Sequence, residues 1–440
     1  MVNPVVDSVP RTNHRVITTV LYDAMLRPNW YCYIGFWMIV LVANLGSTSF
    51  KYKLFDMAAG ERVLAEGAAD RIGLPESAWT FTPTGQAQRS GNAALADHGA
   101  AIELHLHELV QAGVIEKMED VHAIGFKAVH GGPLEVVQVD EHVLEVMQEF
   151  ADVAPAHNPP YIAAMRAFAR RLPGIPQVAA FETAFHQSIP LHRQAYAIPY
   201  EWTEKLGIRR YGFHGASHRY IATRMAELNA AAQKIISVHL GGSSSVNATR
   251  SGKSVANSFG MTAQAGLPQA SRCGDFDTFA LLKLLQAGLT LDEIWKKLGK
   301  EGGLLGVSGV SSDCRDVEQA AAQGNKRAQL ALDIFVESAR QYIGSYLAVL
   351  NGADAVIFTG GIGQNAVNIR QRIMSDMQYA GIVLDKEKNR RAKGECRIDA
   401  SESKVQIWVL PTNEELIVAR QTVQALSKTG RIAATAGRAD

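Results

Sequence analysis

Two segments of the chain repeat one pattern, in which an apolar strand runs into a Gly/Ser turn and returns as a second strand. The first reads VLVANLGSTSF (residues 40–50) and the second reads IISVHLGGSSSV (residues 235–246). The two segments lie about one domain's length apart, since a domain usually contains ~100–200 residues. The repeat therefore predicts two similar α/β domains, each presenting a glycine-rich hairpin to a shared cleft.

Strand-like and helix-like segments alternate along the rest of the chain, which is typical of α/β proteins. We expect strands at 38–44, 50–56, 62–67, 123–129, 234–240, 355–358 and 405–410. We expect helices at 97–111, 141–150, 160–171, 275–286, 291–298, 326–350 and 414–426. Asn413 is placed to cap the last of these helices.

Composition narrows the class of protein. The 440 residues are 47% hydrophobic, and 44 basic against 43 acidic residues give a formal net charge of +1. Such a chain has enough apolar material for a large core, and it lacks the basic surplus typical of proteins that bind nucleic acid or anionic membranes. The four cysteines are far apart and form no CxxC pair, which favours free thiols in a reducing cytosol over disulfides or a zinc site. They are Cys32, Cys273, Cys314 and Cys396.

The segment from Trp30 to Ala43 is apolar throughout. It is shorter than the ~20 residues that a spanning helix needs, and its second half is rich in β-branched residues. We therefore interpret that second half as a buried strand. The residues before it, 1–37, are expected to form a poorly packed extension that adds no catalytic group and is dispensable for folding.

Glycine-rich turns at strand ends allow backbone N–H groups to approach phosphate oxygens closely. The chain has such segments at 44–51, 241–245 and 359–365, and together they indicate a phosphate-binding site. No Walker A sequence and no strand-linked GxGxxG with an acidic partner is present, which disfavours P-loop and Rossmann sites.

Histidine, arginine and glutamate side chains are the candidates for chemistry. Among the histidines in motif-like contexts, His214 lies between Phe213 and Gly215 in a turn from which it can reach a cleft. Arg272 precedes a predicted helix, where it can bind a phosphate or carboxylate, or instead pair with a nearby aspartate. Glu414 follows Pro-Thr-Asn at a helix start, where it is either a dipole-favoured acid or a Mg²⁺ ligand.

Taken together, these motifs resemble the acetate kinase family, which forms acyl phosphates within the sugar kinase, heat-shock ATPase and actin superfold. The resemblance extends from about residue 38 to 426. Besides the 44–56 segment it rests on VHGG (129–132), PAHNP (155–159), TAFHQ (183–187), PYEWTEKLGIRRYGFHGASH (199–218), GKSV (252–255), SRCGD (271–275), LLGVSGVSSDCRD (304–316), TGGIGQN (359–365) and PTNEEL (411–416).

The resemblance implies two ribonuclease H-like domains of the actin/hexokinase type, with mixed sheets flanked by helices and an active site in the cleft between them. The first domain would comprise 38–187 and 416–440, and the second, nucleotide-binding domain 188–415. The resemblance also implies a cytoplasmic homodimer with no nucleic acid or membrane partner.

The implied reaction is reversible in-line transfer of the γ-phosphoryl group of ATP to a short-chain carboxylate. Mg²⁺, with Mn²⁺ as an alternative, would be held by Asn44 and Glu414. The catalytic groups would be Glu182, His214 and Arg272, and the acid would contact Lys127, Val129, His157 and Phe213. The nucleotide would contact Lys51, His239, Leu240, Gly241, Gly242, Ser243, Asp313, Cys314, Arg315, Gly361, Ile362, Gly363, Gln364 and Asn365.

Several positions differ from the family pattern. Lys127 replaces an arginine, Glu182 an aspartate and Gly242 the asparagine of an H-L-G-N-G turn, while Ala156 replaces a leucine and Ala263 a proline. Two alternatives therefore stay open: a kinase that prefers propionate or butyrate, and a nucleotide-binding module without transfer activity. If the ammonium of Lys127 touches the longer carboxylate of Glu182, the two replacements would compensate. The alternative is that they are independent changes that weaken activity.

Overall fold

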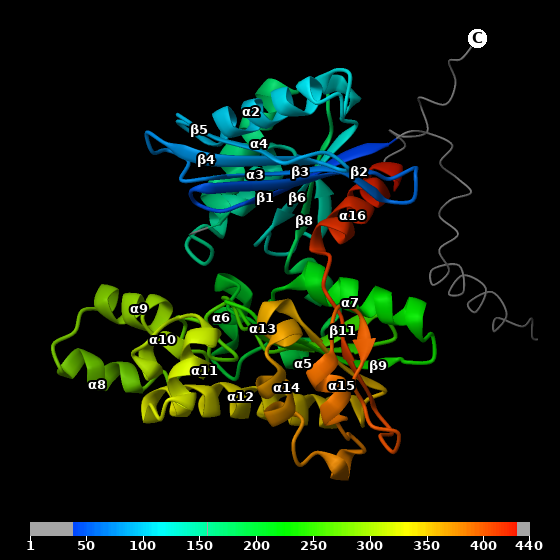
Figure 1. Cartoon of the computed structure of the whole chain (residues 1–440). Helices are drawn as coiled ribbons and strands as arrows, with labels where there is room; N and C mark the ends of the chain where they lie inside the picture. Colours follow the sequence, from blue (N-terminus) through cyan, green and yellow to red (C-terminus); the bar gives the residue numbers. More distant parts are fainter. Residues whose placement is uncertain (1–37, 156, 429–440) are drawn as a thin grey trace, which may run out of the picture.

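A computed structural model describes residues 38–155 and 157–428 of the chain. It contains two lobes, each built on one mixed β-sheet, arranged one above the other (Figure 1). The predicted extension at 1–37 and Ala156 lie outside the described residues. Among the residues that are described, no helix combines the length and apolar character needed to cross a bilayer.

The first lobe holds an eight-stranded sheet in the order β5-β4-β3-β2-β1-β6-β8-β7. Its strands are β1 (Ile39–Leu45), β2 (Ser49–Asp56), β3 (Arg62–Asp70), β4 (Ser77–Pro83), β5 (Arg89–Ala93), β6 (Ala123–Ala128), β7 (Val136–Gln138) and β8 (Gln177–Phe181). Its helices are α2 (His98–Gln111), α3 (Glu141–Glu149) and α4 (Asn158–Arg171), joined by α16 (Glu414–Lys428) from the end of the chain.

The second lobe holds a six-stranded sheet in the order β11-β10-β9-β12-β14-β13. Its strands are β9 (Lys234–His239), β10 (Ser245–Arg250), β11 (Lys253–Asn257), β12 (Ala355–Thr359), β13 (Cys396–Arg397) and β14 (Gln406–Val409). Its helices are α5 (Leu191–Gln194), α6 (Tyr200–Leu206), α7 (Gly215–Leu228), α8 (Ala280–Gln286), α9 (Leu291–Lys300), α10 (Gly303–Ser308), α11 (Cys314–Ala322), α12 (Lys326–Leu350), α13 (Gly360–Asn365), α14 (Val367–Ile373) and α15 (Lys386–Arg391).

The two sheets share one topology, as the repeated sequence pattern predicts. In the first, β3-β2-β1 form an antiparallel meander, and β6 and β8 continue the sheet in parallel with β1. In the second, β11-β10-β9 form the meander, and β12 and β14 continue it in parallel. The predicted α/β fold with two mixed sheets is therefore confirmed, while the residue boundaries of the two domains stay a prediction.

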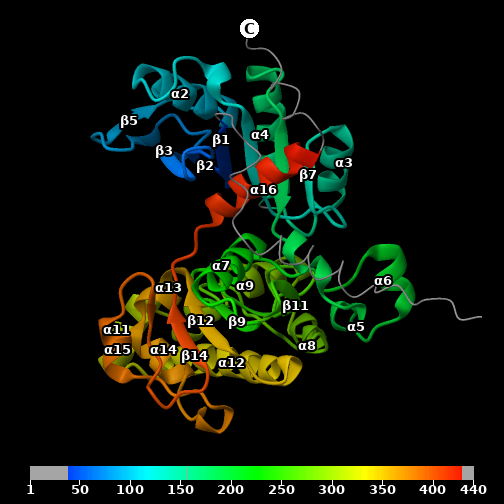
Figure 2. The ribbon, with the colours of Figure 1, turned by 90° about the vertical axis from the view of Figure 1, so that its right-hand side faces the viewer.

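Strand β1 is buried on both faces, which explains its uninterrupted apolar sequence. Its side chains at 39, 41 and 43 join the core beneath α2 and α4, and those at 38, 40 and 42 pack against α16. Helix α16 also bonds both lobes, because Arg420 pairs with Glu61 of the first lobe at 2.7 Å and with Glu227 of α7 at 3.7 Å. Figure 2 shows α16 descending from the first sheet toward the second lobe.

Two sequence-based expectations need correction. The predicted helix over 275–286 begins only at Ala280, because the Asp275 backbone N–H and carboxylate bond the carbonyl and N–H of Gly266. The glycine segment at 359–365 forms helix α13 rather than a turn. Gly360, with φ of +76°, opens that helix by turning the chain so that the N–H groups of Ile362 and Gly363 donate to the Leu240 carbonyl. By contrast, the predicted cap is confirmed, since Asn413 accepts from the Leu416 N–H at 3.2 Å.

The buried His105 on α2 gives the first lobe a predictable sensitivity to acid. The ring is 2% exposed and contacts Phe50 and Tyr52, and burial lowers its pKa to about 4. Below the ordinary histidine pKa of ~6.5, His105 is protonated in the unfolded chain but not in the folded chain. The free energy of unfolding therefore falls as pH falls. For this shift the loss between pH 7.5 and pH 5 is about 2 kcal/mol.

We therefore expect His105→Leu to reduce the difference in urea midpoint between pH 7.5 and pH 5 relative to the unmodified chain. The exposed His142 of α3 offers a matched control, and His142→Leu should retain the original difference. An unchanged acid sensitivity in His105→Leu would contradict this assignment.

Candidate active site

Several of the predicted site residues lie where the carboxyl ends of the central strands face the space between the lobes. Lys127 lies on β6, Glu182 follows β8, His239 ends β9 and Gly361 follows β12. Parallel strands bring the loops at their carboxyl ends together, which is where α/β proteins bind ligands. The N-termini of α7 and α16 reach the same region, carrying His214 and Glu414.

Lys127 is the central charge of this region. Its ammonium pairs with the carboxylate of Glu414 and lies 3.6 Å from Oε1 of Glu182. Burial opposes its charged form, but the two carboxylates outweigh burial and raise the pKa of Lys127 above its ordinary value. The contact between Lys127 and Glu182 on which compensation depends is therefore present, and the cluster joins β6, β8 and α16 at one point.

Glu182 links this charge cluster to the second lobe. Its Oε2 accepts a hydrogen bond from the Ala216 N–H in the first turn of α7 at 3.1 Å. The approach is close enough that a Cβ on Gly215 would lie 2.1 Å from the Glu182 carbonyl oxygen, so glycine is required there. Burial raises the pKa of Glu182 to about 7, against the opposing effect of Lys127.

The ring of His214 stacks on the ring of His239, with centroids 4.1 Å apart and planes 29° apart. His214 has a left-handed backbone, with φ of +57°, at the N-terminus of α7. Such a conformation is uncommon outside glycine and often marks a functional position. Burial, followed by the effect of neighbouring rings and cations, lowers the pKa of His214, and burial likewise lowers that of His239. Both rings are therefore neutral at physiological pH.

The predicted acid-binding residues also include His157, Val129 and Phe213. Burial and then the positive charges of Arg272 and Lys127 lower the pKa of His157, which places this ring within the field of both cations. Val129 is half-buried directly after β6. Phe213 is buried, with its ring edge-on to Phe259 at 5.7 Å.

Arg272 is held by three acceptors. Its Nη1 lies 3.0 Å from Oε1 of Gln269, 3.2 Å from the Ala263 carbonyl and 3.3 Å from Oγ of Ser243. The Ser243 hydroxyl in turn donates to Gln269 at 2.8 Å. The guanidinium is thus oriented before any substrate arrives, and Ser243, at the last position of the family's glycine-rich turn, takes part in that orientation.

Two of the three predicted phosphate-binding segments, 241–245 and 359–365, lie side by side. Gly241 would place a Cβ 3.9 Å from the Gly361 backbone nitrogen, and the Leu240 carbonyl accepts from both Ile362 and Gly363. Gly242 is exposed and its Cβ position is open, so its backbone is accessible to a ligand. Asn365 donates from Nδ2 to the Gly361 carbonyl, which closes α13, and the Gln364 carbonyl accepts from Arg370.

A third predicted nucleotide segment lies at the start of α11. Asp313 caps this helix and pairs with Arg315 at 2.6 Å, and the Arg315 side chain is 87% exposed. Cys314 is buried in the core of the second lobe, so only its backbone is available to a ligand. That this segment and the glycine segments contact a common nucleotide stays a prediction.

Asn44 and Glu414 are the predicted metal ligands, and their donor chemistry suits Mg²⁺. Both supply oxygen atoms, and Mg²⁺ takes few protein oxygens while keeping waters and substrate phosphates. Asn44 accepts from the Tyr161 hydroxyl at 3.2 Å, and Lys127 favours the ionised form of Glu414, lowering its pKa against the effect of burial. No group of three or more His, Cys, Asp or Glu suited to a metal occurs among residues 38–155 and 157–428.

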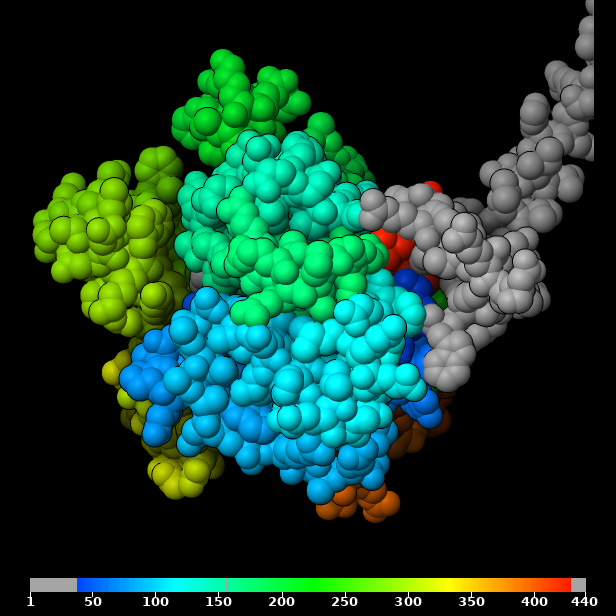
Figure 3. Space-filling view, turned by 90° about the horizontal axis from the view of Figure 1, so that it is seen from above, coloured from blue at the N-terminus to red at the C-terminus, as the bar shows by residue number. Residues whose placement is uncertain are grey.

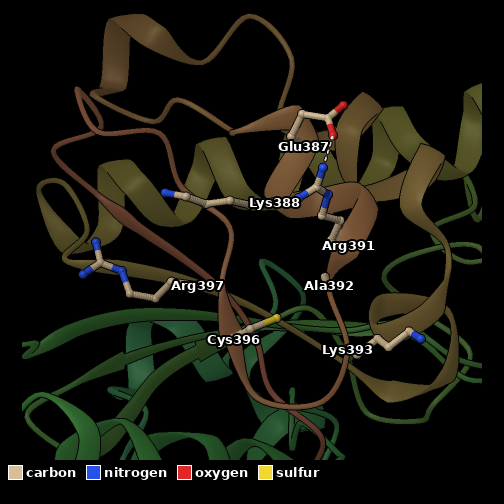
Figure 4. A pocket seen from close by; sticks show the side chains of 7 residues that line it. All are labelled: Glu387, Lys388, Arg391, Ala392, Lys393, Cys396 and Arg397. Carbon is tan, nitrogen blue, oxygen red and sulfur yellow. Dashed lines mark ion pairs between the residues drawn. The ribbon is translucent and has the colours of Figure 1, made fainter.

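Asn44 also lines a hollow of about 270 Å³ over the first sheet. Lys51 is exposed in that hollow, paired in register with Asn44 across the hairpin, and Glu415 borders it. A second hollow, of about 320 Å³, lies between α15 and β13 (Figure 4). It contains none of the predicted site residues, and its basic side chains point in different directions.

Sequence reasoning missed several residues that orient the site. Tyr161 bonds Asn44, Gln269 bonds Arg272, and the Ser245 hydroxyl lies 2.8 Å from Nδ1 of His214. His218 was visible in the YGFHGASH motif, but nothing in the sequence showed that its ring would lie next to Ser245. Tyr161 and Gln269 gave no signal, because their partners are distant in the chain or part of an irregular loop.

Comparison with known proteins gives one consistent result. The acetokinase family model matches residues 39–420. An acetate kinase from Desulfitobacterium hafniense is 44% identical over 400 residues, covering 89% of this chain and 100% of the relative. The crystal structure of Porphyromonas gingivalis acetate kinase has a TM-score of 0.82 at 39% identity, covering 88% of this chain and 100% of that one. A propionate kinase from Francisella tularensis also reaches 0.82 at 35% identity, covering 88% and 99%.

The family model spans nearly all of the described residues, and the relatives are covered along their whole length. This chain belongs to the acetokinase family.

Proposed function

We propose that the chain phosphorylates a short-chain carboxylate with ATP, producing an acyl phosphate and ADP in a reversible reaction. The observation that carries this proposal is the convergence of Lys127, His214 and Arg272 in a chain of this family. These three donors come from different elements, yet Lys127 and Arg272 both act on the pKa of the His214 ring. Phosphoryl transfer depends mainly on positioning and on stabilising charge on the transferring group, and such donors supply both.

The reaction does not need a general base to activate the acid. One carboxylate oxygen of the acid attacks the γ-phosphorus while the bond to the β–γ bridging oxygen breaks, and the bridging oxygen leaves with ADP. The attacking carboxylate is already ionised at neutral pH, so no proton has to be removed from it. Arg272 and His214 would stabilise the transferring group, while Lys127, Val129, His157 and Phe213 would surround the acid. Glu182 would orient the attack through Lys127 and the first turn of α7.

The nucleotide would lie along the adjacent segments 239–243 and 361–365, with 313–315 as a further contact and Lys51 on its phosphates. Mg²⁺, or Mn²⁺, would be held by Asn44 and Glu414, where it would neutralise phosphate charge. The ammonium of Lys127 already keeps Glu414 ionised, as a metal ligand must be. The open backbone at Gly242 supports close approach of a phosphate without the asparagine that the family pattern has there.

The direct test is acyl-hydroxamate formation from ATP and a panel of acetate, propionate and butyrate. We expect hydroxamate with at least one of them. A family member with small residues at Ala263 and Ala156 should accept propionate or butyrate with kcat/KM at least comparable to acetate, since one methylene commonly changes specificity about 10- to 200-fold. Ala156→Leu should then shift the preference toward acetate.

This panel separates the alternatives. A preference for the longer acids identifies a propionate or butyrate kinase, which is favoured by the half-buried Ala263, whose carbonyl contacts Arg272. ATP binding without hydroxamate from any acid would contradict the proposed transfer and leave a nucleotide-binding module. Strong acetate preference would contradict the enlarged pocket while retaining the kinase.

The contact between Lys127 and Glu182 predicts non-additive kinetics. Lys127→Arg places a larger planar group between two carboxylates, and Glu182→Asp withdraws the carboxylate from the ammonium. We expect each change alone to lower kcat/KM at least about tenfold, equivalent to about 1.4 kcal/mol. The double variant should have a higher kcat/KM than the sum of the two single losses in free energy predicts.

The pair of Arg89 on β5 and Glu108 on α2, 3.2 Å apart, offers the control. Arg89→Lys combined with Glu108→Asp should leave kcat/KM unchanged, singly and together. Losses at Lys127 and Glu182 that add within about 0.5 kcal/mol would contradict the coupling.

We also propose that the chain forms a homodimer in the cytoplasm. Helix α8 contains no buried residue although it is rich in leucine, and exposed apolar side chains continue onto α9. These side chains are Phe279, Leu282, Leu285, Leu291 and Trp295. This segment projects beyond the first lobe (Figure 3), and an exposed apolar patch of this kind is typical of an interface between protein chains.

We expect Leu282→Lys to convert the dimer to a monomer, measured by light scattering on a sizing column, because a buried ammonium lacks a partner there. Leu74, in the first lobe, is exposed to a similar extent, 54% against 56%, and Leu74→Lys should leave the dimer intact. A chain that is monomeric before any substitution would contradict the proposal.

A further inference from the structure

We propose that a buried chain of hydroxyl and imidazole groups, Ser237–His218–Ser245, fixes the tautomer of His214 so that its Nε2 carries the proton. The inference rests on the proposed function for its consequence, but the tautomer itself can be measured without substrate. His218 and the two serines would be positioning residues, because they act on the reacting groups only through the His214 ring.

The four groups are connected by three short contacts. Ser237 Oγ lies 2.7 Å from Nδ1 of His218, Nε2 of His218 lies 2.8 Å from Ser245 Oγ, and Ser245 Oγ lies 2.8 Å from Nδ1 of His214. Ser237, Ser245 and His218 are at most 1% exposed. Strands β9 and β10 supply the serines, α7 supplies His218, and His214 is the N-cap of α7, so three elements hold these groups in place.

Both imidazoles are neutral, which leaves one proton and one lone pair on each ring. Burial, together with the neighbouring rings, lowers the pKa of both His214 and His218. The Ser245 hydroxyl has a single proton and can donate to one ring only. It accepts from the other ring, because accepting from both would leave its own buried proton without an acceptor among the described residues. All three contacts must therefore run in the same direction, either toward His214 or away from it.

Ser237, at the end of the hydrogen-bonded series away from His214, decides between these directions. If the bonds run away from His214, Ser237 accepts from His218 and its own proton needs another acceptor. Among the residues that the structure describes, no other acceptor for the Ser237 hydroxyl is present. A buried unsatisfied donor costs about 1–3 kcal/mol. If the bonds run toward His214, the Ser237 proton is used on His218 and no buried donor is left over.

His214, at the other end of the hydrogen-bonded series, favours the same direction. When Ser245 donates to Nδ1 of His214, the remaining ring proton is on Nε2. A neutral N–H donor suits an anionic phosphoryl oxygen, whereas the opposite tautomer would present a lone pair to that oxygen. The hydrogen-bonded groups thus make His214 a donor without giving it a positive charge, which the burial of its ring would oppose.

The test combines spectroscopy of the ligand-free protein with kinetics. Nitrogen-15 spectra of histidine-labelled chain report which ring nitrogen is protonated, and His214→Gln identifies the signals of His214. We expect a protonated Nε2 and an unprotonated Nδ1 in the unmodified chain. Ser245→Ala should remove this preference and give a mixture of tautomers. It should also lower kcat about 10- to 100-fold, while the KM for ATP changes less than about threefold.

Two further variants separate orientation from general damage to the fold. His218→Leu leaves Ser245 without a donor, so its hydroxyl can either donate or accept, and the tautomers of His214 should again mix. His218→Gln supplies an amide N–H near the position of Nε2 and should restore both the tautomer and most of kcat. Ser258, a buried serine that accepts from the Val246 N–H, is the control, and Ser258→Ala should change neither readout.

A proton on Nδ1 of His214 in the unmodified chain would overturn the proposal, as would unchanged His214 spectra in Ser245→Ala. An unmodified chain with the expected tautomer but no hydroxamate from any acid would instead contradict the proposed function and leave the hydrogen-bonded chain standing.

Discussion

The contact of Lys127 with two carboxylates is the constraint on which the arrangement of the site depends. Glu182 comes from the end of a strand in the first sheet, and Glu414 from a helix that the chain reaches only after completing the second sheet. A single buried ammonium therefore fixes elements that are far apart in sequence. Removing Lys127 would leave two buried carboxylates without their cation, and breaking a buried ion pair in this way costs about 3–5 kcal/mol.

The same cluster aligns the two lobes. Glu182 accepts from the first turn of α7, and α7 begins directly after His214, so the carboxylate that meets Lys127 also fixes the helix that carries the histidine. Gly215 makes this possible, because any side chain there would collide with the Glu182 backbone. The left-handed conformation of His214 follows from the same tight connection. The position of the His214 ring is thus a consequence of charge pairing in the first lobe and hydrogen bonding in the second.

Much of this organisation could be predicted from the sequence, and the reason is periodicity. The repeat of strand, glycine turn and strand predicted the shared topology, and the continuous apolar run of β1 predicted burial on both faces. The Lys127–Glu182 contact was predictable because two replacements of opposite charge in one pattern suggested compensation. Tyr161, Gln269 and Ser245 were not predictable, because their importance comes from partners that only the folded chain brings near. Asp275 shows the complementary failure, since a loop contact took the residue that local sequence assigns to a helix.

The balance of charge explains why the site uses neutral histidines. Lys127 is compensated by two carboxylates, whereas Arg272 contacts only neutral acceptors, namely a carbonyl, an amide and a hydroxyl. Among the described residues, Arg272 is therefore a cation without a carboxylate partner, and an anionic phosphoryl group would be attracted to it. An imidazolium at His214 would add a second uncompensated charge beside a stacked ring and in the field of Lys127, and burial prevents this. A neutral N–H donor avoids that repulsion and still stabilises developing negative charge. The serine and histidine groups behind His214 are thus the counterpart of the carboxylates around Lys127: one set controls where charge resides, and the other controls where a proton resides.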